Sequence, residues 1–471
     1  MRNFPKFLFS LNFLYIALIA AQVAAIVFLC LYIPAFLPVA VVVLTAWAIT
    51  TVTAVILFAR SSAAEVKSAW FVLITAIPVA GSVIYLLATL KRPDCGVLDV
   101  EKEYVGGGLE AAAKSLCGTV ESGYDRAEYF SSGTEYFKVL ISEIERAKES
   151  VYIEYFIIAR GHIFNAVCEA LQKAAKNGAE IKIILDGIGS LLRIGKRDIK
   201  RLKELGAEVK TFHRLTPYPR PNLNFRDHRK IVTVDGKTAF TGGINLADEY
   251  ANITSPYGYW KDSGLVIYGA AAKIFEGMFL AVWQKKYTMS APRGGKARCL
   301  PFYDSPHSRA FFEDACVYAI NNSVGRVHIM TPYFCVSEKT AAALVFAARR
   351  GVDIKIILPH IPDKKYAFEI SKAYAKELQL SGIKFYEFTP GFMHAKCLVC
   401  DNQVFLGSYN FDSRSTRLNY ECGAVFGEEM TEKAELDFNE CLALSSEFSE
   451  GKITAFRKTY RFILKLLAPL I

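Results

Sequence analysis

Two stretches of the chain decide its fold: FRDHRKIVTVDGKTAFTGGIN at residues 225–245 and FMHAKCLVCDNQVFLGSYN at residues 392–410. Both read His-x-Lys-x4-Asp, then a pair of small residues, then x-Asn. The matching positions are His228, Lys230, Asp235, Gly242, Gly243 and Asn245 in the first stretch and His394, Lys396, Asp401, Gly407, Ser408 and Asn410 in the second. A pattern of this length that occurs twice indicates an internal duplication.

The flanks of the two stretches support the duplication. AAKNGAEIKIIL at 174–185 precedes the first stretch, and AARRGVDIKIIL at 347–358 precedes the second. Asp262-Ser-Gly-Leu-Val-Ile and Glu421-Cys-Gly-Ala-Val-Phe follow them. Strands alternate with helical patterns in the same order twice, which predicts an α/β protein of two homologous halves, 125–298 and 299–471. We expect largely parallel sheets covered by helices, with the active site between the halves across a pseudo-two-fold axis.

The repeated residue types suit chemistry at a phosphodiester. At the period of a strand, His228 and Lys230 share one face, as do His394 and Lys396. One imidazole can attack phosphorus while the other protonates the leaving oxygen, and two lysines can neutralise the phosphate. The candidate catalytic residues are therefore His228, Lys230, Asp235, His394, Lys396 and Asp401, with the two aspartates expected to brace the turns.

Four further residues are candidate ligands of the substrate phosphate: Gly243, Asn245, Ser408 and Asn410. Small residues let the backbone approach a phosphate, and asparagine supplies neutral donors. A nucleophilic histidine needs its second ring nitrogen held by a carboxylate, and we expect Asp262 and Glu421 to orient the histidines. Plain structural ion pairs are the alternative for each pair of acids.

The N-terminal residues 1–92 are predicted to be a membrane anchor. Apolar segments lie at about 8–32, 37–59 and 68–90, and no charged residue occurs from Phe7 to Ala59. One span needs about 20 residues, so these segments predict a multi-pass protein of the cell membrane. Pro78 and Gly81 interrupt the third segment, which leaves open whether it crosses and which side carries the catalytic halves. A signal peptide and a buried core hairpin are the alternatives.

The rest of the chain adds three expectations. Residues 93–124 are predicted to be a linker with some helix, and the scattered cysteines, 11 in number, are interpreted as reduced apolar filler. The C-terminal TAFRKTYRFILKLLAPLI is either a basic amphipathic helix at a bilayer interface or a terminal helix packed on its domain. The formal net charge of +10 suits an anionic surface, whether lipid or nucleic acid.

These residues resemble the phospholipase D superfamily, and in particular its bacterial cardiolipin synthases. Besides the paired motif, the resemblance includes Trp70, Pro78, Gly81 and Tyr85 in the third apolar segment and the strand that holds Glu154 and Tyr155. It extends to YWKD at 259–262, TPYF at 331–334, NFDSRS at 410–415 and the terminal APL at 468–470.

The resemblance implies transfer of a phosphatidyl group between two phosphatidylglycerol molecules through a phosphohistidine, giving cardiolipin and glycerol. It implies His228 as the nucleophile and His394 as the acid and base, with no cofactor and no metal. The expected partners are phosphatidylglycerol and an anionic lipid surface, not nucleic acid; the oligomeric state stays open. A membrane-anchored phospholipase D or nuclease is the alternative enzyme, and a lipid-binding scaffold is the non-catalytic one.

The chain departs from the family pattern at two places. The first motif carries Gly-Gly where Gly-Ser is usual. The second motif has five residues between Asp401 and Gly407, whereas the first has six between Asp235 and Gly242. A turn that is one residue shorter can displace Ser408 and Asn410, which bears on their contacts with the phosphate.

Overall fold

The structure is a computed structural model that describes residues 20, 21, 24, 36–60, 63–89, 96–101, 107–214, 224–306, 311–451 and 453–470. The chain forms two compact units. The larger unit comprises 94–212 and 225–461 and contains both copies of the motif; the smaller comprises 1–93, 213–224 and 462–471. The first apolar segment expected from the sequence, 8–32, falls almost entirely outside the described residues.

The first half of the larger unit is built on one mixed sheet, ordered β3-β11-β9-β8-β4-β5-β6. Its strands are β3 (Arg126–Phe130), β4 (Ser150–Tyr155), β5 (Glu180–Asp186), β6 (Glu208–Phe212), β8 (Lys230–Val234), β9 (Thr238–Gly242) and β11 (Gly264–Tyr268). The motif strand β8 lies near the centre, between β9 and β4.

The second half repeats this order in its own sheet, as β13-β20-β19-β18-β14-β15-β16. These strands are β13 (Ala297–Asp304), β14 (Arg326–Met330), β15 (Asp353–Pro359), β16 (Lys384–Phe388), β18 (Cys397–Cys400), β19 (Gln403–Gly407) and β20 (Asn419–Phe426). Two short strands extend its edges, β2 (Ser122–Tyr124) on β13 and β21 (Ser445–Glu447) on β16. The identical strand order shows that the halves share one fold.

The expectation of largely parallel sheets was wrong. In the first sheet only the β4–β5 and β5–β6 pairings are parallel, and the other four are antiparallel. The reason is the short turn after the motif: two or three residues can join antiparallel strands only, since a parallel crossover needs a dozen or more.

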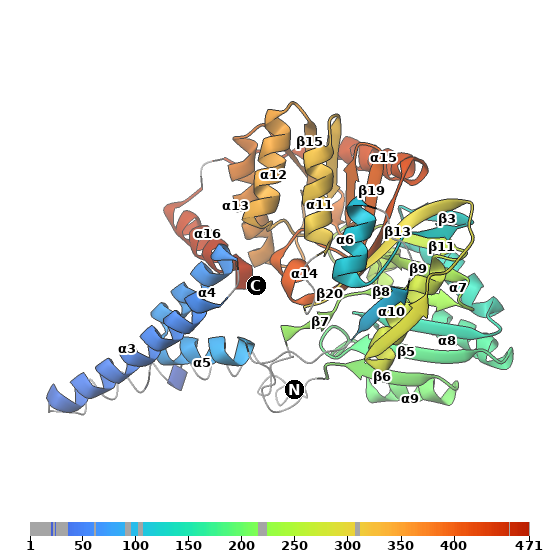
Figure 1. Cartoon of the computed structure of the whole chain (residues 1–471), viewed down its shortest axis with the longest axis horizontal. Helices are drawn as coiled ribbons and strands as arrows, with labels where there is room; N and C mark the ends of the chain where they lie inside the picture. The colour runs from blue at the N-terminus through green and yellow to red at the C-terminus, as the bar shows by residue number, and fades with distance from the viewer. Residues whose placement is uncertain are drawn as a thin grey trace. The chain divides into compact units, whose positions relative to one another are not determined.

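Helices cover both faces of each sheet (Figure 1). In the first half, α7 (Gly133–Arg146) and α8 (His162–Lys176) pack together, and α10 (Ala272–Gln284) packs on the opposite face, where Phe279 stacks on Tyr152. In the second half, α11 (Phe311–Asn322) and α12 (Glu338–Arg349) pair, while α15 (Glu428–Ala443) stacks Phe438 on His328. The remaining elements are α9 (Lys196–Glu204), η2 (Asp248–Ala251), α13 (Lys365–Gln379) and α14 (Ser413–Arg417).

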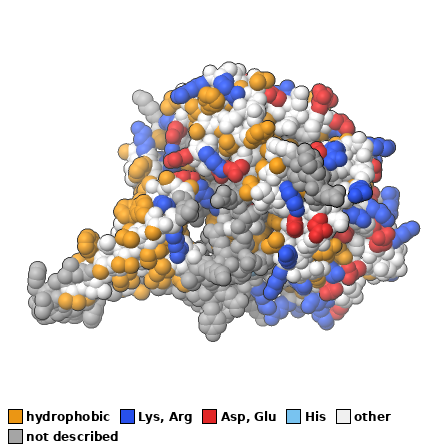
Figure 2. All heavy atoms as spheres, viewed as in Figure 1, with side chains coloured by type: hydrophobic (Ala, Val, Ile, Leu, Met, Phe, Trp, Pro, Cys, Tyr) orange, Lys and Arg blue, Asp and Glu red, His pale blue; other side chains and the backbone are white. Residues whose placement is uncertain are grey.

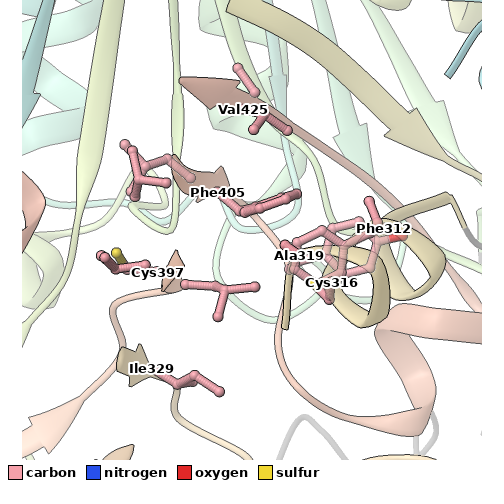
Figure 3. Packing of buried hydrophobic residues seen from close by; sticks show 14 of the residues in the cluster. Phe312, Cys316, Ala319, Ile329, Cys397, Phe405 and Val425 are labelled. Carbon is pink, nitrogen blue, oxygen red and sulfur yellow. The ribbon is translucent and has the colours of Figure 1, made fainter. Parts of the chain in front are cut away.

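The core of the second half lies between α11 and its sheet. Figure 3 shows Phe312, Cys316 and Ala319 of α11 beside strand residues Ile329, Cys397, Phe405 and Val425. The nine cysteines among the described residues are all buried and free, which agrees with their interpretation as apolar filler. The same apolar cluster continues into the first half through Ile231, Leu265 and Phe275, so the two halves share one core.

The segment expected to be a linker is partly integrated into the larger unit. Its strand β1 (Val97–Glu101) pairs in parallel with β12 (Lys286–Ser290). Its helix α6 (Gly108–Cys117) buries Ala113 and Cys117 in the shared core. The expected helix is therefore present, and it packs as part of the domain.

The smaller unit contains α3 (Phe36–Ala59), α4 (Ala64–Ala76), α5 (Pro78–Thr89) and the terminal turn η3 (Ala468–Leu470), which contacts α4. Within the described residues one helix is apolar and long enough to cross a membrane, at Val41–Ala59. The third apolar segment is interrupted near Pro78, since α4 ends at Ala76 and α5 begins at Pro78. Trp70 and Tyr85 close this bend, with ring centroids 5.3 Å apart.

Candidate active site

Each motif histidine is held by a strand pairing that crosses between the halves. The short strand β7 (Arg226–Asp227) pairs in parallel with β20 of the second half, and His228 N donates to Tyr420 O at 2.9 Å. In the symmetric position, β10 (Tyr259–Lys261) pairs with β17 (Gly391–Met393), and His394 N donates to Lys261 O at 2.6 Å. Each histidine therefore lies next to the acidic residue of the other half.

The side chains complete the crossed arrangement. Nδ1 of His228 lies 2.9 Å from Oε2 of Glu421, and Nδ1 of His394 lies 2.6 Å from Oδ2 of Asp262. All four side chains are nearly or fully buried. A carboxylate at Nδ1 favours the proton on that nitrogen, which leaves Nε2 unprotonated for attack or proton transfer. Nδ1 of His394 has a second partner, Nζ of Lys396 at 2.8 Å. Sequence reasoning named both acids but could not say which histidine each would meet.

The motif lysines lie beside the histidines and are buried. Lys230 Nζ donates to the carbonyl of His228 at 2.5 Å, and Lys396 Nζ donates to the carbonyl of His394. Burial lowers the pKa of Lys230 to about 8 and that of Lys396 to about 7. Asp262 and Glu421 offset this effect only in part, so an incoming phosphate anion would further stabilise the charged form of both lysines.

Burial also lowers the pKa of both histidines, and for His394 the nearby charge of Lys396 lowers it further, to about 3. Each lysine also acts on the histidine of the other half: Lys396 on His228 and Lys230 on His394. The two motif copies therefore form one electrostatic site, in which both imidazoles are neutral before substrate binds.

The two orienting acids have different environments. Glu421 also accepts from the hydroxyls of Ser408 and Ser415 and from Asn419 Nδ2. Asp262 accepts from Ser263 N at 2.9 Å and from Trp260 Nε1 at 3.4 Å. Burial alone would raise the pKa of each acid, but the facing histidine and lysine lower it, so both carboxylates are ionised.

The residues expected to bind phosphate lie around the site, and some of their polar atoms are hydrogen-bonded to other protein groups. Ser408 Oγ donates to Glu421 Oε2, and Asn245 bonds Ile157 N and Tyr250 Oη through its two amide ends. Asn410 N donates to Ser415 Oγ. Gly243 lies against Asp262 and Lys396.

The shorter second turn does not displace this half of the site. Gly242 pairs with Gly264 in the first sheet, and Gly407 pairs with Gly423 in the second. Gly264 lies two residues after Asp262, and Gly423 lies two residues after Glu421, so the two pairings are equivalent. The deletion is absorbed at the far end of the hairpin, where two residues instead of three join the strands. The strand register at the small-residue pair is therefore the same in both halves, and Ser408 stays beside Glu421.

Asp235 and Asp401 lie at that far end, away from the histidines. Asp235 accepts from the backbone N–H groups of residues 148–150, and Asp401 accepts from those of residues 324–326. Both have positive φ, 52° and 49°. Each aspartate lies five positions after its motif lysine, and five residues along a strand span roughly 16 Å. These carboxylates therefore brace the turns and are too far away to contact a phosphate at the histidines.

Sequence reasoning missed two buried ionic clusters beside the site. Arg229, fully buried, bridges Glu154 at 2.7 Å and Asp227 at 3.0 Å on the opposite side of the motif strand from His228. Lys261 Nζ contacts Asp437 Oδ2 at 2.7 Å, which also accepts from Tyr129. The sequence carried a signal for the first cluster. Asp227 and Arg229 alternate with His228 and Lys230, which indicates that the motif strand has charged side chains on both of its faces.

More aromatic rings lie against His394 than against His228 among the described residues. The rings of Tyr250, Trp260 and Phe392 have centroids 5.1–5.6 Å from the His394 ring. Phe156 lies 5.1 Å from the His228 ring. The apolar wall lowers the local dielectric, which strengthens the charge interactions in the site.

Comparison with known proteins identifies the family of the chain. The family model described as "Cardiolipin synthase, PLD-like domain" matches residues 140–283 and 317–442. The chain belongs to the cardiolipin synthase family of phospholipase D-like proteins. The matched segments include both motif copies and both orienting acids of this cardiolipin synthase-like enzyme.

Relatives match over most of the chain. An uncharacterised protein of Streptococcus mutans is 35% identical over 74% of this chain and 78% of its own length. A cardiolipin synthase of Clostridium perfringens is 30% identical over 86% of this chain and 94% of its own length. The crystal structure of a phosphatidylserine synthase from Haemophilus influenzae is similar in fold, with a TM-score of 0.58 at 14% identity, covering 77% of this chain and 97% of that one.

Proposed function

We propose that this enzyme transfers a phosphatidyl group from one phosphatidylglycerol to another, giving cardiolipin and glycerol. The observation that supports the proposal is the crossed arrangement of His228 with Glu421 and His394 with Asp262. It brings two imidazoles and two lysines into one buried site, and a two-step exchange at phosphorus requires one imidazole that attacks and a second that gives and takes the proton.

In the first step, Nε2 of His228 attacks phosphorus and the bond from phosphorus to the glycerol oxygen breaks. His394 protonates that oxygen, and glycerol leaves. The phosphodiester is an anion beside both lysines, and its charge favours the protonated form of His394 despite the low pKa of this imidazole in the empty site. Lys230 and Lys396 stabilise the charge that develops on the phosphoryl oxygens.

In the second step, a hydroxyl of the second phosphatidylglycerol gives its proton to His394, and its oxygen attacks phosphorus. The bond from phosphorus to His228 breaks, which regenerates the neutral imidazole. One phosphodiester replaces another, so the exchange needs no nucleotide. The aromatic wall of Tyr250, Trp260 and Phe392 near His394 would hinder water from replacing the lipid hydroxyl.

Asp262 and Glu421 act as positioning residues that hold the tautomer and stabilise the imidazolium formed during proton transfer. Asp235 and Asp401 support the turns. We infer that Gly243 and the backbone around Asn245, Ser408 and Asn410 line the phosphate, since the side chains of Ser408 and Asn245 are engaged within the protein.

We further infer that the enzyme works at the cell membrane. Helix α3 exposes Val43, Trp47, Val52 and Val55, and its 19 residues Val41–Ala59 reach the length that a span needs. Figure 2 shows hydrophobic side chains along α3. Water does not favour so large an apolar surface, and a bilayer would cover it.

The test is incubation of the purified full-length protein with phosphatidylglycerol vesicles while glycerol release and lipid products are followed. We expect glycerol and cardiolipin in equal amounts, and neither with His228→Asn. Phosphatidic acid as the main product would overturn the synthase proposal in favour of hydrolysis.

A further inference from the structure

The C-terminal helix α16 (Ala455–Leu467) has an unusual orientation on the protein. A surface helix normally buries its apolar face and exposes its charges. In α16 Arg461 faces inward and two phenylalanines face outward: Arg461 is 5% exposed, whereas Phe456 is 83% and Phe462 is 68% exposed.

The inward face is held by ion pairs, of which those of Arg461 are buried and that of Arg457 is half-exposed. Arg461 donates to Glu369 and Glu450 at 2.6 Å each, and Arg457 donates to Glu369 at 2.6 Å. Glu369 lies on α13 and Glu450 follows β21, so both acids belong to the catalytic unit. These guanidinium contacts fix how the helix is turned about its own axis, because rotating it would leave buried charges unpaired.

The outward face is consequently apolar. Phe456, Tyr460 and Ile463 recur at helical spacing along one side, and Phe462 extends the face toward the exposed Lys458. Single exposed apolar residues are common, but four on a helix of 13 residues form a patch that marks an interaction site.

The position of the patch in the chain indicates what covers it. Residues 462–471 belong to the same compact unit as α3, and the η3 turn that follows α16 contacts α4. The patch is thus continuous in sequence with the part of the protein that holds the apolar spanning helix. Phe and Tyr with a flanking Lys are the residue types that settle at the boundary of headgroups and acyl chains.

We propose that Phe456, Tyr460, Phe462 and Ile463 form a membrane-docking face that lies in the interface of an anionic lipid bilayer. The ion pairs to Glu369 and Glu450 would transmit this docking to the catalytic unit, because they hold the first turns of α16 on that unit. The docking face makes no use of the active site, so the inference stands apart from the reaction proposed above.

The test places a photoreactive phenylalanine analogue, benzoylphenylalanine, at position 456 or 462 of the full-length protein in phosphatidylglycerol vesicles. Position 346 is the matched control, since Phe346 is an aromatic residue 56% exposed on α12 of the catalytic unit. All three proteins carry α3, so each is tethered to the vesicles by the same segment. Mass spectrometry after irradiation counts lipid adducts at each probe.

We expect lipid adducts at 456 and 462 in about tenfold excess over 346, because a residue at the boundary of acyl chains contacts lipid continuously. Cross-links to a second copy of the chain in place of lipid would overturn the proposal and assign the face to self-association. Adduct levels equal to those at 346 would also overturn it. None of these outcomes depends on turnover, so failure here leaves the proposed reaction untouched.

Discussion

A Cβ placed on Gly243 would lie 2.0 Å from Oδ1 of Asp262, the carboxylate that holds His394. The same atom would lie 3.0 Å from Cδ of Lys396. In the other half the equivalent position is Ser408, whose hydroxyl donates to Glu421. The departure from Gly-Ser in the first motif is therefore linked to the acid beside it: Asp262 leaves no room for a side chain, while Glu421 receives a hydrogen bond from one.

Gly243→Ser gives the first half the residue of its counterpart, and we expect it to reduce kcat by about 10- to 100-fold. The added side chain would displace Asp262 and misorient His394, and changes to a residue that holds a reacting side chain in place have effects of this size. Ser408→Gly is the matched control, since Glu421 retains Ser415 and Asn419 and the loss should be smaller. Wild-type kcat for Gly243→Ser in detergent-dispersed phosphatidylglycerol would show that Asp262 tolerates the shift.

Lys230→Ala and Lys396→Ala should each reduce turnover by about 10²-fold or more, because each removes charge stabilisation at the phosphoryl oxygens. Folding should survive, since neither Nζ is held in an ion pair among the described residues and each bonds a backbone carbonyl. Circular dichroism and thermal unfolding give the control. An aggregating variant would identify that lysine as a structural partner instead.

The roles of the two histidines can be separated by trapping the covalent intermediate. His228→Asn should abolish any phosphohistidine, while His394→Asn should slow both steps yet still accumulate some adduct from a lipid with a good leaving group. Alkaline quenching followed by mass spectrometry of the peptides that hold each histidine locates the phosphate. Phosphate on His394 would reverse the assignment.

The value of kcat/KM should fall as pH rises from about 7 to 9. Burial lowers the pKa of Lys396 to about 7 and of Lys230 to about 8, so both lysines are charged below this range and lose charge above it. This ratio reports groups of the free enzyme, which is where these pKa values apply. A profile that stays flat to about pH 10, the range of an ordinary lysine, would contradict the prediction.

The ion pair of Lys261 with Asp437 should couple the two halves. Lys261→Met or Asp437→Asn should each destabilise the protein by about 3–5 kcal/mol, because either leaves a buried charge unpaired. The double variant should lose less than the sum of the two, as measured by thermal unfolding of the full chain in detergent. Strict additivity would mean that the pair makes no net contribution.

Much of this protein follows from sequence alone. The repeated His-x-Lys-x4-Asp pattern and its matching flanks predicted two homologous halves, and the strand orders agree. The strand period predicted that His228 and Lys230, like His394 and Lys396, would share a face. Local patterns of this kind can be read from the sequence because the direction of a side chain along a strand depends only on its place in the strand.

Pairings between distant residues were decided by the tertiary structure. His228 and Glu421 are 193 positions apart, and no local pattern says that each acid crosses to the other half. The same holds for Ser408 on Glu421, for the clusters of Arg229 and Lys261, and for the antiparallel centre of each sheet. In α16 the sequence shows both arginines and aromatic residues, but it does not say which of them turn inward. Glu369 and Glu450 decide that Arg461 does. Burying a guanidinium requires an anion, and here distant segments of the chain supply it.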